Sequence, residues 1–154
     1  MQLLHCIKRG LTGYITYLTA CSMREAYSEY LLYEPILRIL TARDCKVRCE
    51  FPCAGLGRPG GDKRRLDFKV ESRQGEFAIE VKWAKKRAAN VARDLEKLLW
   101  FKEANPRSAA YLCVFGTKSK IEHLVLRPRR LTEVGKPVYC DVRKTIYGCR
   151  FYKV

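Results

Sequence analysis

Apolar residues recur at helical spacing in two long segments of the chain. In the segment 23–42 they are Tyr27, Tyr30, Leu31, Ile36, Leu37 and Leu40, and in the segment 88–104 they are Val91, Leu95, Leu98, Leu99 and Phe101. Residues three or four positions apart lie on the same side of an α-helix, so each segment has one apolar face. We therefore predict two amphipathic helices, the second of which ends before Pro106.

The start of the first helix has its own signals. Ser22 followed by Glu25 forms a capping box, in which each side chain satisfies a backbone N–H of the first turn. Pro35 lacks a backbone N–H, so it should kink this helix or restart it. The preceding segment 1–20 contains Lys8 and Arg9 and lacks the continuous apolar stretch of a secretion signal, which indicates an amphipathic helix or a loop.

Shorter segments have the patterns of strands. We predict strands at 45–52, 63–71, 76–83 and 109–115, a short helix at 118–126, and further strands at 138–142 and 145–154. The segment 54–62 is a loop by its glycine content. The core order is helix, three strands, helix, strand. This order predicts a single α/β domain over residues 1–154, with a mixed sheet flanked by helices.

The two middle strands can be aligned around the turn Ser72-Arg73-Gln74-Gly75. If paired residues have numbers that add up to 147, all the pairs on one face are apolar: Leu66 with Val81, Phe68 with Ile79, and Val70 with Phe77. Slipping the register by one residue would turn this apolar set to the opposite face. The pattern therefore predicts one register for the hairpin.

The same register places charged residues on the other face of the hairpin. Asp67 falls opposite Glu80, and Arg65 falls opposite Lys82. Opposed side chains lie about 5 Å apart at Cβ, where two carboxylates repel each other. A divalent cation such as Mg²⁺, Mn²⁺ or Ca²⁺ would offset that repulsion. A metal held there could polarise a phosphate, and Lys82 could stabilise the developing charge or, with a depressed pKa, activate water.

A simpler interpretation of the same face needs no metal. An amphipathic hairpin exposes charged residues to solvent, and 31% of this chain is charged, so acid falls opposite acid by chance in some hairpins. Spacing alone leaves both interpretations open.

The charge of the chain favours a polyanionic partner. Thirty-one Lys and Arg residues against 16 Asp and Glu residues give a formal net charge of +15. Such an excess attracts nucleic acid, although a basic protein without a particular ligand has the same composition. An acidic membrane surface is a weaker third option. No apolar run is long enough to span a membrane, and the lack of a secretion signal favours an intracellular, cytoplasmic protein.

The eight cysteines leave a different hypothesis open. Cys45, Cys49 and Cys53 repeat every four residues, which in a strand would place them on one face. Structural zinc sites use such cysteines with a second, distant pair, but the remaining spacing fits this pattern poorly. Buried thiols scattered through the core are the favoured interpretation.

The segments Arg65-Leu66-Asp67-Phe68 and Ala78-Ile79-Glu80-Val81-Lys82-Trp83 resemble the PD-(D/E)XK nuclease superfamily over residues 23 to 116. The resemblance implies a restriction-endonuclease-like αβββαβ core, with an extra N-terminal helix and C-terminal strands around it. Asp67 and Glu80 match the metal-binding acids of the motif, Lys82 matches its catalytic lysine, and the Val81 carbonyl is a further candidate ligand. Leu66 stands where the family name has proline.

The resemblance also suggests residues outside the hairpin. Members often carry a glutamate in the first helix that reaches toward the metal, and Glu29 is our choice over Glu25 and Glu34. Glu50 is another acid close to the motif in sequence. The pattern Asp94-x-x-Lys97-Leu98 is common in the helix after the lysine, where it packs beside the site.

The function implied by the resemblance is Mg²⁺- or Mn²⁺-dependent phosphodiester hydrolysis, with DNA favoured over RNA and with a homodimer as an expected assembly. Exposed cations close to the motif would contact the nucleic acid backbone; they are Arg65, Lys85, Lys86, Arg87 and Arg93. The alternative is a non-catalytic nucleic-acid-binding protein with the same fold.

Overall fold

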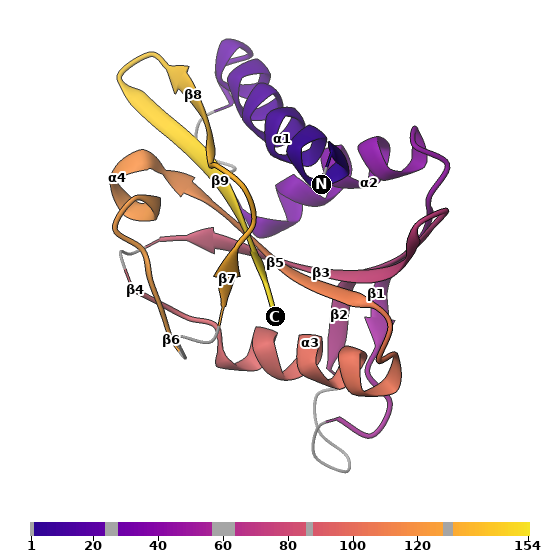
Figure 1. Ribbon diagram of the computed structural model, residues 1–154. Coiled ribbons are helices and arrows are strands. Elements are labelled where there is room, and N and C mark those ends of the chain that lie inside the picture. The colour runs from indigo at the N-terminus through magenta and orange to yellow at the C-terminus, as the bar shows by residue number, and fades with distance from the viewer. Residues whose placement is uncertain (1, 24–27, 57–63, 86–87, 128–130) are drawn as a thin grey trace.

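A computed structural model describes residues 2–23, 28–56, 64–85, 88–127 and 131–154 (Figure 1). In these ranges the centre of the molecule is a mixed seven-stranded sheet with the strand order β1-β2-β3-β5-β9-β7, and β8 also pairs with β9. The strands are β1 (Lys46–Pro52), β2 (Arg65–Ser72), β3 (Gly75–Ala84), β5 (Ala109–Thr117), β7 (Thr132–Glu133), β8 (Val138–Val142) and β9 (Thr145–Lys153). Only the β3–β5 pair is parallel in this sheet. The predicted mixed α/β class is therefore confirmed.

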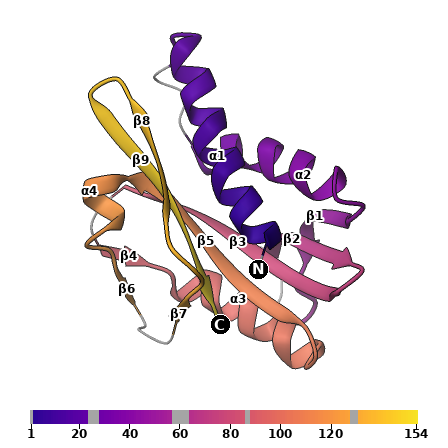
Figure 2. The same ribbon diagram turned by 45° about the horizontal axis from the view of Figure 1, so that its top comes forward.

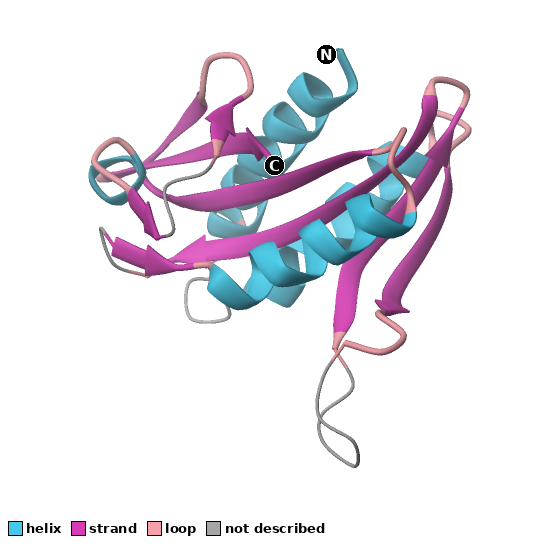
Figure 3. Cartoon of the chain, turned by 60° about the horizontal axis from the view of Figure 1, so that its bottom comes forward, coloured by secondary structure: helices cyan, strands magenta, loops and turns pink. Residues whose placement is uncertain are grey.

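Helices cover both faces of this sheet (Figures 1 and 2). Helices α1 (Gln2–Ala20) and α2 (Tyr33–Thr41) lie on one face, where they share an apolar core with β2, β3, β5 and β9. Helix α3 (Ala92–Ala104) lies across the other face, over β3 and β5 (Figure 3). Within the described ranges, no helix is long and apolar enough to cross a membrane.

Helix α1 resolves the choice between helix and loop at the N-terminal end. Its buried apolar residues recur every three or four positions: Leu4, Ile7, Leu11, Ile15 and Leu18. This spacing turns one continuous stripe toward the sheet. Lys8 lies on the same buried side, and its Nζ donates hydrogen bonds to the carbonyl oxygens of Val134 (3.1 Å) and Lys136 (2.6 Å). A lysine thereby ties α1 to the segment before β8.

The predicted helix at 23–42 is wrong at Met23 and Ser28, the described residues before Glu29, neither of which is helical. Ser22 is not a helix N-cap, because it has a φ of 63° and its N–H bonds to the Thr19 carbonyl at the end of α1. The helical structure begins with a 3₁₀ turn, η1 (Glu29–Leu32), and continues as α2. Pro35 lies in the first turn of α2, where its missing N–H costs nothing, so the restart was correctly predicted. Residues 24–27, including Glu25 and Tyr27, lie outside the described residues.

The hairpin of β2 and β3 confirms the predicted register in its turn-proximal half. Phe68 pairs with Ile79, Val70 with Phe77, and Ser72 with Gly75. Gly75 has a φ of 116°, a conformation that side chains disfavour and glycine accepts. Counted from the turn, the last pair of the ladder is Phe68 with Ile79. Asp67 and Glu80 are the next residues on the two strands.

Beyond Phe68 the predicted apolar face is wrong. Phe68 and Val70 pack in the α1–α2 core, but Leu66 packs in the α3 core. The neighbouring strand β1 changes in the same way around Glu50, whose φ of 50° interrupts the alternation of side chains. Both strands therefore turn at the level of Asp67, and Leu66 no longer shares a face with Val81.

The connection from β3 to α3 also differs from the prediction. The segment Ala88–Asn90 is not the start of the helix but a short strand, β4, which pairs in parallel with β6 (Val125–Arg127). The predicted helix at 118–126 is correspondingly reduced to α4 (Lys118–Ile121). Pairing between two distant segments thus overrode the local helical pattern at both places.

Candidate functional site

Two hydrogen bonds connect Asp67 of β2 with the consecutive residues Glu80 and Val81 of β3, where the β2–β3 ladder ends. The N–H of Val81 donates to Asp67 Oδ2 (2.7 Å), and the N–H of Asp67 donates to Glu80 Oε1 (3.1 Å). Each carboxylate therefore accepts a hydrogen bond from a backbone N–H group. The predicted proximity of the two acids is confirmed, and their orientations are fixed by the backbone.

The two acids are buried, Glu80 against Lys97 of α3 and Asp67 beside the hydroxyl of Tyr33 in α2. Glu80 is 1% exposed and Asp67 is 9% exposed. The interpretation of this face as a solvent-exposed charged surface is therefore wrong for these two residues. The physical reason is the apolar side of α3, since Leu95 and Leu98 pack against the same face of the sheet. Burial of two carboxylates is costly unless hydrogen bonds and cations compensate.

Burial dominates the electrostatics of the pair. It raises the pKa of Glu80 well above its ordinary value; the nearby Asp67 raises it further, and Lys97 partly offsets both. Burial also raises the pKa of Asp67, against hydrogen bonds from the Tyr33 hydroxyl and the Val81 N–H. The pair therefore favours any cation that can enter the site.

Lys82 lies at the outer side of this pair, between two further acids. Its Nζ is 3.4 Å from Asp94 Oδ2 and 3.7 Å from Glu29 Oε1. Burial works to lower the pKa of Lys82, but Asp94 and Glu29 outweigh it, so that the pKa lies above its ordinary value. The suggestion that Lys82 acts as a base through a depressed pKa is wrong for this arrangement. Lys82 is a fixed positive charge.

Of the two candidate helix glutamates that the structure describes, Glu29 is the one that reaches the sheet. Its Oε1 accepts a hydrogen bond from the Trp83 N–H (2.9 Å), so η1 is attached to β3 beside Lys82. Glu34 instead pairs with Arg38 on the surface of α2. Glu25 lies outside the described residues.

Helix α3 supplies a second lysine that the sequence did not assign to the acids. The Nζ of Lys97 pairs with Glu80 Oε2 and lies 3.8 Å from Asp94 Oδ1, one turn earlier on the helix. The Asp94-x-x-Lys97 spacing indicated that both residues share one face of this helix. The acid that Lys97 contacts depends on the crossing angle between α3 and β3. This angle cannot be inferred from the sequence pattern.

Hydrogen bonds and ion pairs join six charged residues into one ionic cluster: Glu29, Asp67, Glu80, Lys82, Asp94 and Lys97. Four carboxylates against two ammonium groups leave a formal charge of −2. In the described part of the chain, no three His, Cys, Asp or Glu residues converge as a ready metal site. The donor set nevertheless fits a hard divalent cation, because Asp67 and Glu80 supply adjacent oxygen ligands and the cluster lacks two positive charges.

The cysteine hypothesis fails on geometry. Cys45 packs in the α1–α2 core and Cys53 in the α3 core, while Cys49 is exposed. The prediction that the three share one face is wrong, because β1 changes its facing at Glu50. They have no arrangement in which they could bind one zinc ion.

The predicted nucleic-acid-binding residues are only partly described. Arg65, Lys85 and Arg93 are exposed, whereas Lys86 and Arg87 lie outside the described residues. Arg65 pairs with Pro52 of β1, and the β2–β3 ladder ends before it could face Lys82. The three described cations lie close in sequence to the ionic cluster, at the start of β2, the end of β3 and the first turn of α3.

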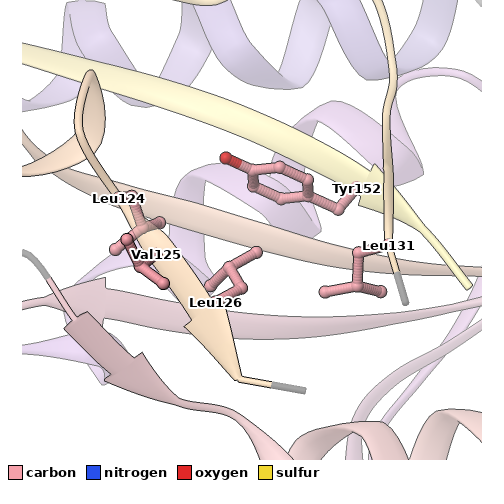
Figure 4. A pocket seen from close by; sticks show the side chains of 5 residues that line it. All are labelled: Leu124, Val125, Leu126, Leu131 and Tyr152. Carbon is pink, nitrogen blue, oxygen red and sulfur yellow. The ribbon is translucent and has the colours of Figure 1, made fainter. Parts of the chain in front are cut away.

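An apolar pocket is lined by none of these acids (Figure 4). It is lined by Leu124, Val125, Leu126, Leu131 and Tyr152 and has a volume of about 250 Å³. Apart from the Tyr152 hydroxyl, its side chains carry no group that could bind a metal or move a proton. The charged side chains of the ionic cluster are therefore the stronger candidates for a functional site.

No family model, no curated protein and no solved structure matches this chain.

Proposed function

We propose that the protein is a metal-dependent nuclease, with Mg²⁺ or Mn²⁺ as its cofactor and DNA favoured as its substrate. The observation that carries the proposal is the interlocked Asp67–Glu80 pair, followed two residues later on β3 by the fixed cation Lys82. Two adjacent oxygen donors and a nearby ammonium group suit phosphodiester hydrolysis, in which negative charge develops on the phosphate.

The order of elements supports a restriction-endonuclease-like core as part of this proposal. Helical residues 29–41 are followed by β1, β2 and β3, then by α3 and the parallel strand β5. This is the αβββαβ order that the sequence resemblance implies. The short parallel pair of β4 and β6, the helix α1 and the strands β7 to β9 are additions to that core.

The residues have distinct roles in this mechanism. Asp67 and Glu80 would hold the metal, with the Val81 carbonyl as a further ligand. When bound, the metal polarises the phosphate and lowers the pKa of a coordinated water. Lys82 stabilises charge on the phosphate and orients the attacking water as a hydrogen-bond donor. Glu29 holds Lys82 and the Trp83 backbone in place, next to Glu80 and Val81 on β3, and would complete the metal's ligand shell directly or through water.

The exposed cations Arg65, Lys85 and Arg93 would attract the nucleic acid, together with the large positive charge of the chain. Contacts with phosphates position the substrate without reading its sequence. Binding should therefore weaken steeply as salt is raised. A homodimer would allow both strands to be cut, and light scattering with and without DNA tests this assembly.

The test is cleavage of plasmid and of single-stranded DNA in Mg²⁺ or Mn²⁺. The wild-type protein should cut, whereas addition of EDTA or the substitution Lys82→Ala should abolish cutting. Lys118→Ala is the matched control, since Lys118 pairs with Glu122 on α4, outside the ionic cluster, and should retain full activity. Equal cleavage by the wild-type and Lys82→Ala proteins would refute the assigned role of Lys82.

One observation favours the second candidate, a non-catalytic nucleic-acid-binding protein. Both oxygens of Glu80 already have partners, the Asp67 N–H and Lys97, so the pair is compensated without a metal. This candidate predicts salt-sensitive DNA binding that EDTA leaves unchanged, and no cleavage. The same preparation distinguishes the two functions.

A further inference from the structure

The ammonium group of Lys97 lies where a metal ion bound to Glu80 would have to lie. Its ammonium group contacts Glu80 Oε2, the one oxygen of that carboxylate that does not accept the Asp67 N–H. Its side chain is 14% exposed, so the pair is largely shielded from water. The charge of Asp67 also acts on Lys97. A single positive charge therefore already lies against the two acids expected to bind a divalent cation.

The two lysines of the ionic cluster are arranged differently. Lys82 contacts Glu29 and Asp94 and leaves Glu80 free of its charge. Lys97 contacts Glu80 directly, and a cation coordinated by Glu80 Oε2 would meet its ammonium group. Two like charges cannot share that oxygen at close range in a site shielded from water.

A place for the displaced ammonium group exists on the same helix. Asp94 Oδ1 lies 3.8 Å from the Nζ of Lys97, one turn earlier on α3. A lysine has a flexible four-carbon stem, so the ammonium can move from Glu80 to Asp94 through side-chain rotation alone. The movement leaves α3 and the sheet in place.

We propose that Lys97 is a tethered competitor of the metal: its ammonium group neutralises Glu80 and Asp67 in the metal-free protein and moves to Asp94 when a divalent cation binds. This inference rests on the proposed function, because it assumes that Asp67 and Glu80 are metal ligands. It assigns to Lys97 a positioning role that sets metal affinity and keeps the buried acids compensated before the metal arrives.

The first test is calorimetric titration of the full chain with Mn²⁺ alone. Lys97→Met removes the charge and keeps an unbranched side chain, and it should bind Mn²⁺ about ten-fold or more tightly than the wild type. Lys97→Arg keeps the charge and should stay as weak as the wild type. Lys118→Met makes the same chemical change outside the ionic cluster and should leave the affinity unaltered. Circular dichroism confirms that each variant is folded.

The second test uses the wild-type protein, so it does not depend on the folding of a variant. Amine acylation followed by mass spectrometry reports how accessible each lysine is. Acylation of Lys97 should be slow without metal and become several-fold faster in saturating Mn²⁺, since its ammonium leaves the buried Glu80. Lys8 of α1 has its ammonium group buried against the segment before β8. It should react equally slowly with and without Mn²⁺.

The outcomes separate this inference from the function it rests on. If the wild type binds Mn²⁺ but Lys97→Met binds no tighter, and the acylation of Lys97 is unchanged by metal, competition is overturned while the nuclease proposal stands. If neither protein binds Mn²⁺ at all, both ideas are overturned together. Tighter binding by Lys97→Met, with metal-dependent acylation of Lys97 in the wild type, supports the inference.

Discussion

Each face of the central sheet carries a lysine that is largely shielded from water, and the two lysines are compensated by different partners. On the α1–α2 face, the Nζ of Lys8 donates to two neutral carbonyl oxygens, those of Val134 and Lys136. On the α3 face, the Nζ of Lys97 contacts the carboxylates of Glu80 and Asp94. Neutral acceptors provide orientation and leave the charge of the lysine intact, whereas carboxylates cancel it.

This difference gives the two lysines different roles: Lys8 stabilises the fold, whereas the pairing of Lys97 can respond to an added cation. The buried side of α1 around Lys8 is mostly apolar, with Leu4, Ile7 and Leu11, and it carries no carboxylate. The surroundings of Lys97 carry an excess of negative charge, so an added cation can change the pairing there. We therefore expect changes around Lys8 and in the buried stripe of α1 to alter stability alone, and changes in the ionic cluster to alter stability in a manner that depends on metal and pH.

The largest effect should come from a cavity in the α1–α2 core. Leu11 is fully buried, and Leu11→Ala should lower the free energy of unfolding by about 3–5 kcal/mol, through lost burial and the cavity left behind. Urea denaturation measures the loss. The same loss with and without Mn²⁺ is expected, since no ligand of the proposed metal is touched. A loss that Mn²⁺ reverses would show that the two faces are not independent.

Lys97→Met should have the next largest effect in metal-free protein. Removal of one partner from a buried ion pair leaves Glu80 uncompensated, which should cost about 3 kcal/mol. Mn²⁺ should restore most of this loss, because the cation replaces the missing charge and stabilises only the folded state. Thermal denaturation with EDTA and with Mn²⁺ measures both values, and a loss that Mn²⁺ leaves unchanged would contradict the comparison.

Lys8→Met should destabilise the protein by about 2 kcal/mol, because two carbonyl oxygens lose a buried donor while the apolar stem is retained. This loss should be identical in EDTA and in Mn²⁺. Lys118→Met is the control: it breaks an exposed i,i+4 pair with Glu122 and a cation–π contact with Tyr139, and it should cost about 1 kcal/mol or less. Rescue of Lys8→Met by Mn²⁺ would mean that α1 is coupled to the ionic cluster.

The smallest effect concerns pH. The pKa of Glu80 is raised by burial, then by Asp67, so in the folded state it keeps a proton that the unfolded state has already released. Its contribution to stability is therefore fully present below the ordinary glutamate pKa and is lost as pH rises through the raised value. One proton limits the slope to about 1.4 kcal/mol per pH unit.

Glu80→Gln should remove the pH-dependent contribution of Glu80 to the free energy of unfolding. Unfolding free energies measured from pH 4 upward should fall less steeply for Glu80→Gln than for the wild type, and the two slopes should become equal above the raised pKa. Glu103→Gln, a substitution on the exposed side of α3, should follow the wild-type curve. Parallel curves for the wild type and Glu80→Gln at every pH would show that Glu80 has an ordinary pKa.

Local patterns predicted those parts of the fold that depend on neighbours in sequence. The register of the β2–β3 hairpin follows from alternation around a four-residue turn, and Pro35 indicated where α2 would restart. The predictions at Ser22 and at 88–90 failed for the opposite reason. Ser22 completes the end of α1, and Ala88–Asn90 pairs with β6, a partner more than 30 residues away.

The sequence by itself determined that Asp67 and Glu80 would be adjacent, since pairing across a tight hairpin is a matter of counting from the turn. Only the tertiary structure decided that both acids would be buried, that Leu66 would face α3, and that Lys97 would reach Glu80. These features depend on the twist of β1 and β2 at Glu50 and on the way α3 crosses the sheet. Packing between distant segments sets both, and no periodicity along the chain encodes either.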